Sequence, residues 1–194
     1  MDGCSSYILK RSFFQRDTAI VAKDLLGKIL VKRSAEGSFT GIIIETEAYY
    51  GIGDPASHAY RGMTPRSRLM FGKAGIAYIY LCYGVYWLLN VVTERTGTPG
   101  AVLIRGLKPI EGIESMRKRR KVSDKKRLTD GPGKLTIAMG ISGADNGIDM
   151  TAGESSLYIG EDPDRKSRPI IENTSRIGIT DGKEKMLRYI AIGL

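Results

Sequence analysis

Apolar and polar residues alternate in short runs along most of the chain, a pattern typical of strands buried on one side. Two of these runs flank a turn at 35–38, and two more meet at Gly84 in a tight hairpin. Helical spacing is rarer: Asp17 can cap a helix that Gly27 ends, and Ile110 opens the spacing of another after Pro109. Strands are expected at 28–33, 39–50, 76–83, 85–93 and 101–107, and further helices at 64–70 and 134–139.

This order of elements predicts one α+β domain over residues 1–194, with an antiparallel sheet. The chain has 194 residues, and 42% of them are hydrophobic, which is enough for one core and short for two. No stretch approaches the roughly 20 apolar residues of a membrane span, and residues 1–11 lack the apolar run of a secretion signal. Two isolated cysteines, Cys4 and Cys82, make neither a disulfide framework nor a metal set, so an intracellular protein is expected.

A net charge of +9 favours a polyanionic partner, although basic faces also keep small domains soluble. Two basic clusters stand out, at 117–121 and 125–127. For the first, a solvated helix face is the favoured interpretation, and auxiliary DNA contact is the alternative. Charge alone therefore leaves nucleic acid and plain solubility evenly matched.

Two carboxylates lie close together in the segment 41–50. In a regular strand, Ile43, Glu45, Glu47 and Tyr49 point to the same side. A carboxylate at the mouth of a groove can activate a water molecule. Two glutamates at this spacing nevertheless lie more often on a solvated strand edge, so the catalytic interpretation depends on the residues around them.

Aromatic residues follow the glutamates along the chain. His58 lies in a Gly- and Pro-rich loop, where it can stack on a flat ligand or simply be exposed. Tyr78 and Tyr80 share one face of a strand, and Tyr83 stands beside Gly84 at the hairpin tip. An outward ring there suits a wedge that enters a DNA base step, and packing over its own hairpin is equally expected.

Two polar residues lie within apolar strands. Asn90 must find hydrogen-bond partners, because a buried amide without them costs roughly 1–3 kcal/mol. Arg105 ends a strand of buried type and needs an anionic partner. Glu47 is the natural partner, and the pairing would keep that carboxylate ionised as a base. Together with the tyrosines and the net charge, these residues suit base flipping.

The order and spacing of these segments closely resemble the alkyladenine (3-methyladenine) DNA glycosylase family. The resemblance covers nearly the whole chain and is tightest from about residue 17 to 109. It rests on IETEAY at 44–49, His58, TPR at 64–66, MF at 70–71, YIYLCYG at 78–84, LNVV at 89–92, AVLIRGLKP at 101–109, GPGKL at 131–135 and SRIGI at 175–179.

The resemblance implies a curved antiparallel sheet with a protruding hairpin, and a monofunctional enzyme that acts as a monomer on damaged purines in double-stranded DNA, without metal or cofactor. Glu47 matches the general base, and Arg105 and the carbonyl of Ile177 match further ligands of the attacking water. Tyr49, His58 and Tyr80 match the stack around the flipped base, Asn90 the residue that disfavours guanine, Tyr83 the intercalating wedge, and Thr64, Tyr86, Lys134 and Gly178 the phosphate contacts. Such an enzyme would be cytoplasmic and nucleoid-associated in a prokaryote, or nuclear in a eukaryote.

Two other functions fit parts of the pattern. In a non-catalytic nucleic-acid-binding module, the tyrosines would be stacking platforms and Glu47 would be structural. In a carbohydrate hydrolase, Glu45 and Glu47 would act as a pair. Neighbours on one strand face cannot flank a sugar from two sides, so the second alternative is disfavoured. Lesion preference among 3-methyladenine, 7-methylguanine, hypoxanthine and ethenoadenine depends on the shape of the pocket.

Overall fold

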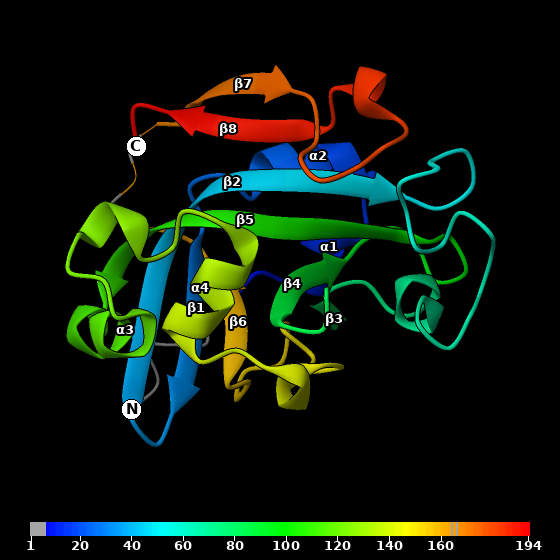
Figure 1. The fold of residues 1–194 in the computed structure, drawn as a ribbon. Helices are drawn as coiled ribbons and strands as arrows, with labels where there is room; N and C mark the ends of the chain where they lie inside the picture. The colour runs from blue at the N-terminus through cyan, green and yellow to red at the C-terminus, as the bar shows by residue number, and fades with distance from the viewer. Residues whose placement is uncertain (1–6, 164, 166) are drawn as a thin grey trace.

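The computed structural model describes residues 7–163, 165 and 167–194, and Cys4 lies outside them. Within these residues, an eight-stranded antiparallel sheet has the order β3-β4-β5-β2-β1-β6, with β8 joining β2 and β7 joining β8 (Figure 1). The elements are α1 (Arg11–Phe14), α2 (Thr18–Asp24), β1 (Ile29–Ser34), β2 (Gly37–Tyr50), η2 (Arg68–Phe71), β3 (Ala77–Cys82), β4 (Tyr86–Val92), β5 (Gly100–Glu111), α3 (Ile113–Arg120), η3 (Lys125–Arg127), α4 (Pro132–Met139), η4 (Gly143–Asp145), β6 (Leu157–Gly160), β7 (Ile170–Thr174), η5 (Lys183–Lys185) and β8 (Arg188–Ile192), where η marks a 3₁₀ turn.

β2 changes its neighbouring strand part-way along its length. Residues 37–42 pair with β1 and residues 45–47 pair with β8, while β5 follows the opposite edge of β2. At the changeover Ile44 has no partner on β5, and one step further Arg105 is the extra residue on β5. Such β-bulges bend strands and increase their twist. The predicted α+β fold around a curved antiparallel sheet is therefore confirmed.

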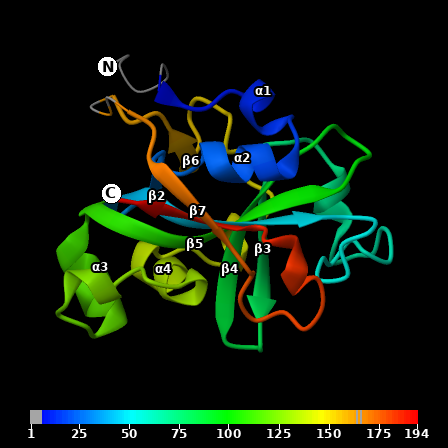
Figure 2. The same cartoon turned by 90° about the horizontal axis from the view of Figure 1, so that it is seen from above.

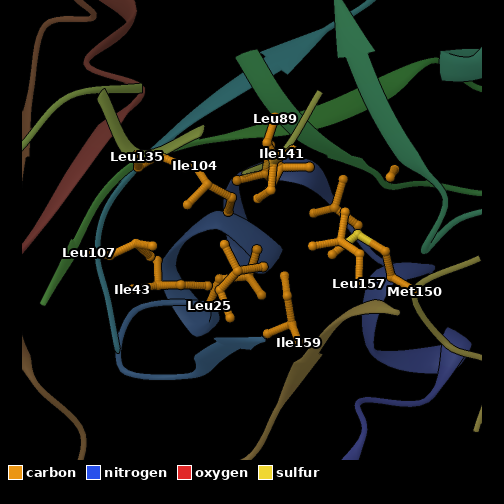
Figure 3. Packing of buried hydrophobic residues seen from close by; sticks show 14 of the residues in the cluster. Leu25, Ile43, Leu89, Ile104, Leu107, Leu135, Ile141, Met150, Leu157 and Ile159 are labelled. Atoms are coloured by element: carbon orange, nitrogen blue, oxygen red, sulfur yellow. The ribbon is translucent and has the colours of Figure 1, made fainter. Parts of the chain in front are cut away.

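Helices lie on both sides of the central strands. In Figure 2, α1 and α2 lie on one side of β2 and β5, and α3, α4 and the β3–β4 hairpin lie on the other. Asp17 caps α2 as predicted, because its carboxylate accepts a backbone N–H of the first turn. Leu25, the residue after α2, packs in the main core with Ile43 and Leu107 of the sheet and Leu135 of α4 (Figure 3).

The predicted hairpin at Gly84 is present and extends away from the central strands (Figure 2). Cys82 pairs with Tyr86, so residues 83–85 connect the strands, and the N–H of Val85 donates to the carbonyl of Cys82 at 3.1 Å within this connection. Tyr83 and Gly84, the two central residues of this turn, have φ of +51° and +69°, both in the left-handed region. Glycine adopts this conformation freely, whereas a tyrosine in it is unusual.

One predicted helix begins three residues later than expected, and the other is absent. Ile110 belongs to β5 as the extra residue of a third bulge, next to the Pro109–Gly41 pair, and α3 begins only at Ile113. Proline is tolerated at bulges, so Pro109 does not end the strand. The helix expected at 64–70 is a turn followed by the short η2. At Ile110 the bulged strand determines the backbone, and at 64–70 a loop does, although the local spacing resembled a helix.

Candidate active site

A groove of about 800 Å³ opens beside the hairpin. Its walls come from the β3–β4 hairpin, β5, the first turn of α4 and the loop between β7 and β8. These segments are distant in sequence, yet they gather on the hairpin side of the sheet (Figure 2). The predicted site residues that line the groove are Tyr49, His58, Tyr80, Tyr83, Tyr86, Arg105, Lys134, Ile177 and Gly178.

Glu47 is fully buried behind this lining. Its Oε2 accepts hydrogen bonds from the Tyr49 hydroxyl at 2.8 Å and from Arg105 Nη1 at 3.2 Å, and its Oε1 accepts one from the Ile177 N–H at 2.7 Å. All three donor residues line the groove. The carboxylate is thus held from three directions next to the space a substrate can enter. Its contact with Ile177 is through the N–H, so the role expected of the Ile177 carbonyl stays a prediction.

The two bulges position the charged residues. Arg105 is the extra residue on β5, and bulges commonly re-aim a side chain next to active sites. Its guanidinium contacts both glutamates of β2, with Nε 2.8 Å from Glu45 Oε1. The expectation that Ile43 shares the glutamate face is wrong, because the bulge at Ile44 breaks the alternation and Ile43 lies in the main core.

Glu45 is held by a second arginine that sequence reasoning missed. Arg188 Nε donates to Glu45 Oε1 at 2.6 Å, so two guanidinium groups share this carboxylate. Arg188 reaches it because β8 pairs with residues 45–47 of β2, a long-range pairing with no local signal. Both glutamates bind Arg105 from the same side, which does not suit the opposed carboxylates of a carbohydrate hydrolase.

Burial raises the pKa of Glu47 above its ordinary value of 4.5, and Arg105, the Ile177 N–H and the Tyr49 hydroxyl each oppose that rise. The expected effect of Arg105 in keeping the carboxylate ionised is therefore present, but burial is the larger influence. A carboxylate with a raised pKa is a stronger base than an exposed one, and a general base works best when its pKa is near the working pH.

Aromatic rings form one wall of the groove. The His58 and Tyr80 rings meet edge to face with centroids 4.5 Å apart, and His58 Nδ1 lies 2.7 Å from the Tyr78 hydroxyl. Burial, helped by the nearby Arg66 charge, lowers the pKa of His58 to about 4, so the ring is neutral at pH 7. Arg66, another residue that sequence reasoning missed, lies 5.1 Å from the centroid of Tyr80. The wall is therefore aromatic, and its His58 ring is uncharged at pH 7, which suits stacking on a base.

Asn90 lines a small cavity of about 30 Å³ together with Tyr49, His58 and Tyr80. Its Nδ2 donates to the Tyr78 carbonyl at 3.1 Å, so the buried amide has the partner that its position requires. Because three of the groove-lining rings also border this cavity, Asn90 lies directly behind the aromatic wall.

The hairpin tip and the rim complete the groove. Tyr83 is 87% exposed, so packing over its own hairpin, one of its two expected roles, is wrong. Tyr86 lies against Gly133 in the first turn of α4, where an added Cβ would lie 2.8 Å from the tyrosine ring. Lys134 pairs with Asp130 at 3.0 Å. Thr64 is exposed, bonds to Ser67 and is outside the groove lining.

Comparison with known proteins identifies the family of this chain. A sequence model of the methylpurine-DNA glycosylase (MPG) family matches residues 12–193. The chain belongs to the methylpurine-DNA glycosylase family. A relative from Prosthecochloris aestuarii is 48% identical over 93% of this chain and 86% of its own length. Another, from Methanoculleus marisnigri, is 44% identical over 95% of both chains, and the names of both describe them as 3-methyladenine DNA glycosylases.

The resemblance read from the sequence is thus confirmed. The chain is a DNA glycosylase of DNA repair, a hydrolase that acts on N-glycosyl bonds in DNA. The non-catalytic module is accordingly set aside. No helix in the described part of the chain is long and apolar enough to cross a membrane. Among the same residues, no three His, Cys, Asp or Glu side chains gather as a metal site would require.

The basic clusters of this glycosylase divide into two kinds of residue. Arg117, Arg119 and Arg120 each donate to a backbone carbonyl of a neighbouring segment. The remaining cations in the two clusters are exposed and have no side-chain partner within the described residues; they are Lys118, Lys121, Lys125, Lys126 and Arg127. The three arginines therefore hold local structure. For the other five, a solvated face stays the favoured interpretation and auxiliary DNA contact the alternative.

Proposed function

We propose that this glycosylase extrudes an alkylated or deaminated purine from double-stranded DNA into the groove and hydrolyses its N-glycosidic bond with a water molecule activated by Glu47. The product is DNA with an abasic site. The observation that carries the proposal is the buried carboxylate of Glu47, held by three groove-lining donors. These donors fix the carboxylate in one orientation before substrate arrives, which is how electrostatic stabilisation becomes catalytic.

In the proposed reaction, Arg105 and the carbonyl of Ile177 share the water with Glu47. The carboxylate takes a proton as the water oxygen bonds to the anomeric carbon, and the bond between that carbon and the base nitrogen breaks. Positive charge grows on the sugar in this step, and the ionised Glu47 stabilises it. An N-alkylated purine leaves readily because it is already positive. A neutral purine must be protonated, and His58, with a pKa of about 4, is a poor acid for this at pH 7.

For recognition, we propose that Tyr83 enters the minor groove and fills the space left by the extruded base. Its exposure at the hairpin tip supports this role. Tyr49, His58 and Tyr80 would stack around the base, and Asn90 would disfavour guanine. Damaged bases flip at lower cost, because they are paired or stacked less well.

Four further positions would contact phosphates and hold the duplex in register: Thr64, Tyr86, Lys134 and Gly178. Three of them line the groove, which supports their roles: Tyr86, Lys134 and Gly178. Thr64 is exposed and lies two residues before Arg66, which also lines the groove. A monofunctional enzyme is proposed because a lyase needs an amine nucleophile. Lys134 is the lysine on the groove lining, and it is ion-paired at the rim. We also propose that the enzyme acts as a monomer inside the cell, without metal or cofactor.

The test is base release from bulk methylated DNA and from a duplex with one hypoxanthine, by the natural enzyme and by Glu47→Gln, with EDTA present. Release by the natural enzyme and none by Glu47→Gln, with lesion binding retained, is the expected result. Release by Glu47→Gln would remove this residue from the role of base. Loss of the natural activity in EDTA would overturn the metal-free mechanism, and the ratio between the two substrates measures lesion range.

A further inference from the structure

A second buried ion pair lies next to the active site. Arg176 Nη1 and Nη2 each lie 2.7 Å from one carboxylate oxygen of Asp54, and both side chains are almost fully buried. Nη1 also donates to the Ala48 carbonyl at 3.0 Å and Nη2 to the Gly182 carbonyl at 3.3 Å. Asp54 in turn accepts the Tyr50 N–H at 3.0 Å. The pair thus joins the end of β2, the loop after it and the loop between β7 and β8.

The position of Arg176 connects this pair to the catalytic carboxylate. Arg176 directly precedes Ile177, whose N–H binds Glu47 Oε1. Its guanidinium carbon lies 4.6 Å from the ring centroid of Tyr49, whose hydroxyl binds Glu47 Oε2. Arg176 therefore holds two of the three donors to Glu47. It holds the Ile177 N–H because the two residues are adjacent in the chain, and it holds Tyr49 because its guanidinium lies against the tyrosine ring.

Stability is a weak reason for such a pair. Burying two charges costs desolvation that their attraction often only repays, and Arg176 Nε is buried without a partner within the described residues. A pair of this kind is better suited to fixing the geometry of the loops it joins. A planar guanidinium that binds a carboxylate through two nitrogens fixes direction as well as distance.

We propose that Arg176 and Asp54 form a positioning pair for the glycosylase reaction, which keeps the Ile177 N–H and the Tyr49 hydroxyl on Glu47. The inference rests on the proposed function, since it assigns the pair to the carboxylate that activates water. Neither residue lines the groove, so the pair acts through the donors to Glu47. Removing the pair lets the loop at 175–182 shift, and Glu47 loses donors that orient it and stabilise its charge.

Loss of these donors should shift the pH dependence of the excision rate in one direction. Fewer donors raise the pKa of Glu47 further, so the acid side of the pH–rate profile moves to higher pH. The charged or titratable groups that influence Glu47 and do not contact the pair stay in place in the variants: Glu45 on β2, Tyr80 on β3, Arg105 on β5 and, through Glu45, Arg188 on β8.

The test compares two double variants that each remove a buried ion pair without leaving one charge behind. Asp54→Asn with Arg176→Met removes the positioning pair. Lys32→Met with Asp145→Asn removes a similarly buried pair that joins β1 to η4, away from the groove. Single-turnover release of 3-methyladenine from methylated DNA, duplex binding and thermal unfolding are measured for both variants across pH. This lesion is chosen because it is already cationic and needs no general acid.

We expect the positioning variant to lose about 10²-fold in rate, as small misplacements of catalytic groups do, with duplex binding little changed and the acid side shifted upward. The control variant should lose stability only. A natural rate and profile in the positioning variant, or an equal loss in the control, would overturn the proposal. If the double variant does not fold, Arg176→Lys keeps the charge but not the fork and should give a smaller shift of the same sign; an unchanged profile there also overturns it.

These outcomes are separate from failure of the proposed function itself. If Glu47→Gln still releases base, the proposed function fails whatever the pair does. If Glu47→Gln is inactive and the positioning variant behaves like the natural enzyme, only the positioning role fails.

Discussion

The floor of the groove and the hairpin tip are built in opposite ways. On the floor, Glu47 is fully buried on a strand and accepts three hydrogen bonds, and Arg105 bridges two carboxylates. At the tip, Tyr83 is 87% exposed and its neighbour Val85 is 67% exposed, on a turn of left-handed backbone. The floor fixes groups that need precise geometry, whereas the tip presents side chains that need a partner from outside. Changes to the floor should therefore alter rate, and changes to the tip should alter binding.

Arg105→Met should have the largest effect. It leaves the buried Glu47 without its cation, which costs on the order of 3–5 kcal/mol of unfolding free energy. Loss of a preorganised donor should also lower single-turnover excision by about 10²–10³-fold. Denaturant unfolding and excision of 3-methyladenine from methylated DNA measure the two effects. Arg188→Met is the matched control, because Arg188 binds Glu45 and not Glu47, and excision as fast in Arg105→Met as in this control would contradict the assigned role.

The pH dependence on the same cationic substrate should come next in size. The carboxylate is the active form of Glu47, and burial raises its pKa above 4.5. The rate should therefore fall as pH falls through that raised pKa, by about tenfold for each pH unit below it. His58 stays neutral until about pH 4, so it adds no step in this range. A rate that is flat down to pH 4.5 would show that no buried carboxylate acts as the base.

Tyr83→Ser tests the tip. A ring that stacks on a base is worth about 1–3 kcal/mol, so binding to a lesion duplex should weaken by roughly 5- to 150-fold. Binding to a single strand with the same lesion should hardly change, because no gap in a base stack needs filling. Titration of both substrates by fluorescence anisotropy measures the contrast. An equal loss on the two substrates would rule out the wedge.

The pairing of Arg105 with Glu47 could be predicted from sequence, because a buried arginine needs a carboxylate and the two strands supply one. The turn at Gly84 was also predictable from local signals. The bulges at Ile44 and Arg105 were not, since they arise where β2 changes its neighbour from β1 to β8. A bulge has no signature in a run such as 41–50, and it altered which side Ile43 faces.

The pair of Asp54 and Arg176 was missed for a different reason. The two residues lie 122 positions apart in two loops, and a lone aspartate among glycines and prolines resembles a turn residue. Arg176 lies in SRIGI, one of the segments that carry the family resemblance. Its place directly before Ile177 was the signal that could have identified it. The start expected for α3 at Ile110 shows the converse error, because apolar spacing after a proline extended the helix pattern onto a bulged strand.

The smallest effect separates tip geometry from tip chemistry. Gly84 has φ of +69° with nothing within 4 Å of a Cβ, so Gly84→Ala should cost only backbone strain, about 1–2 kcal/mol of unfolding free energy. Gly193, just after β8 and outside the groove lining, has φ of +82° and equally open space, which makes Gly193→Ala the matched control. Both should lose similar stability in thermal unfolding, and only Gly84→Ala should weaken lesion-duplex binding, because only it re-aims Tyr83. Equal binding by the two variants would mean that the direction of the Tyr83 ring is set on contact with DNA and not by the turn.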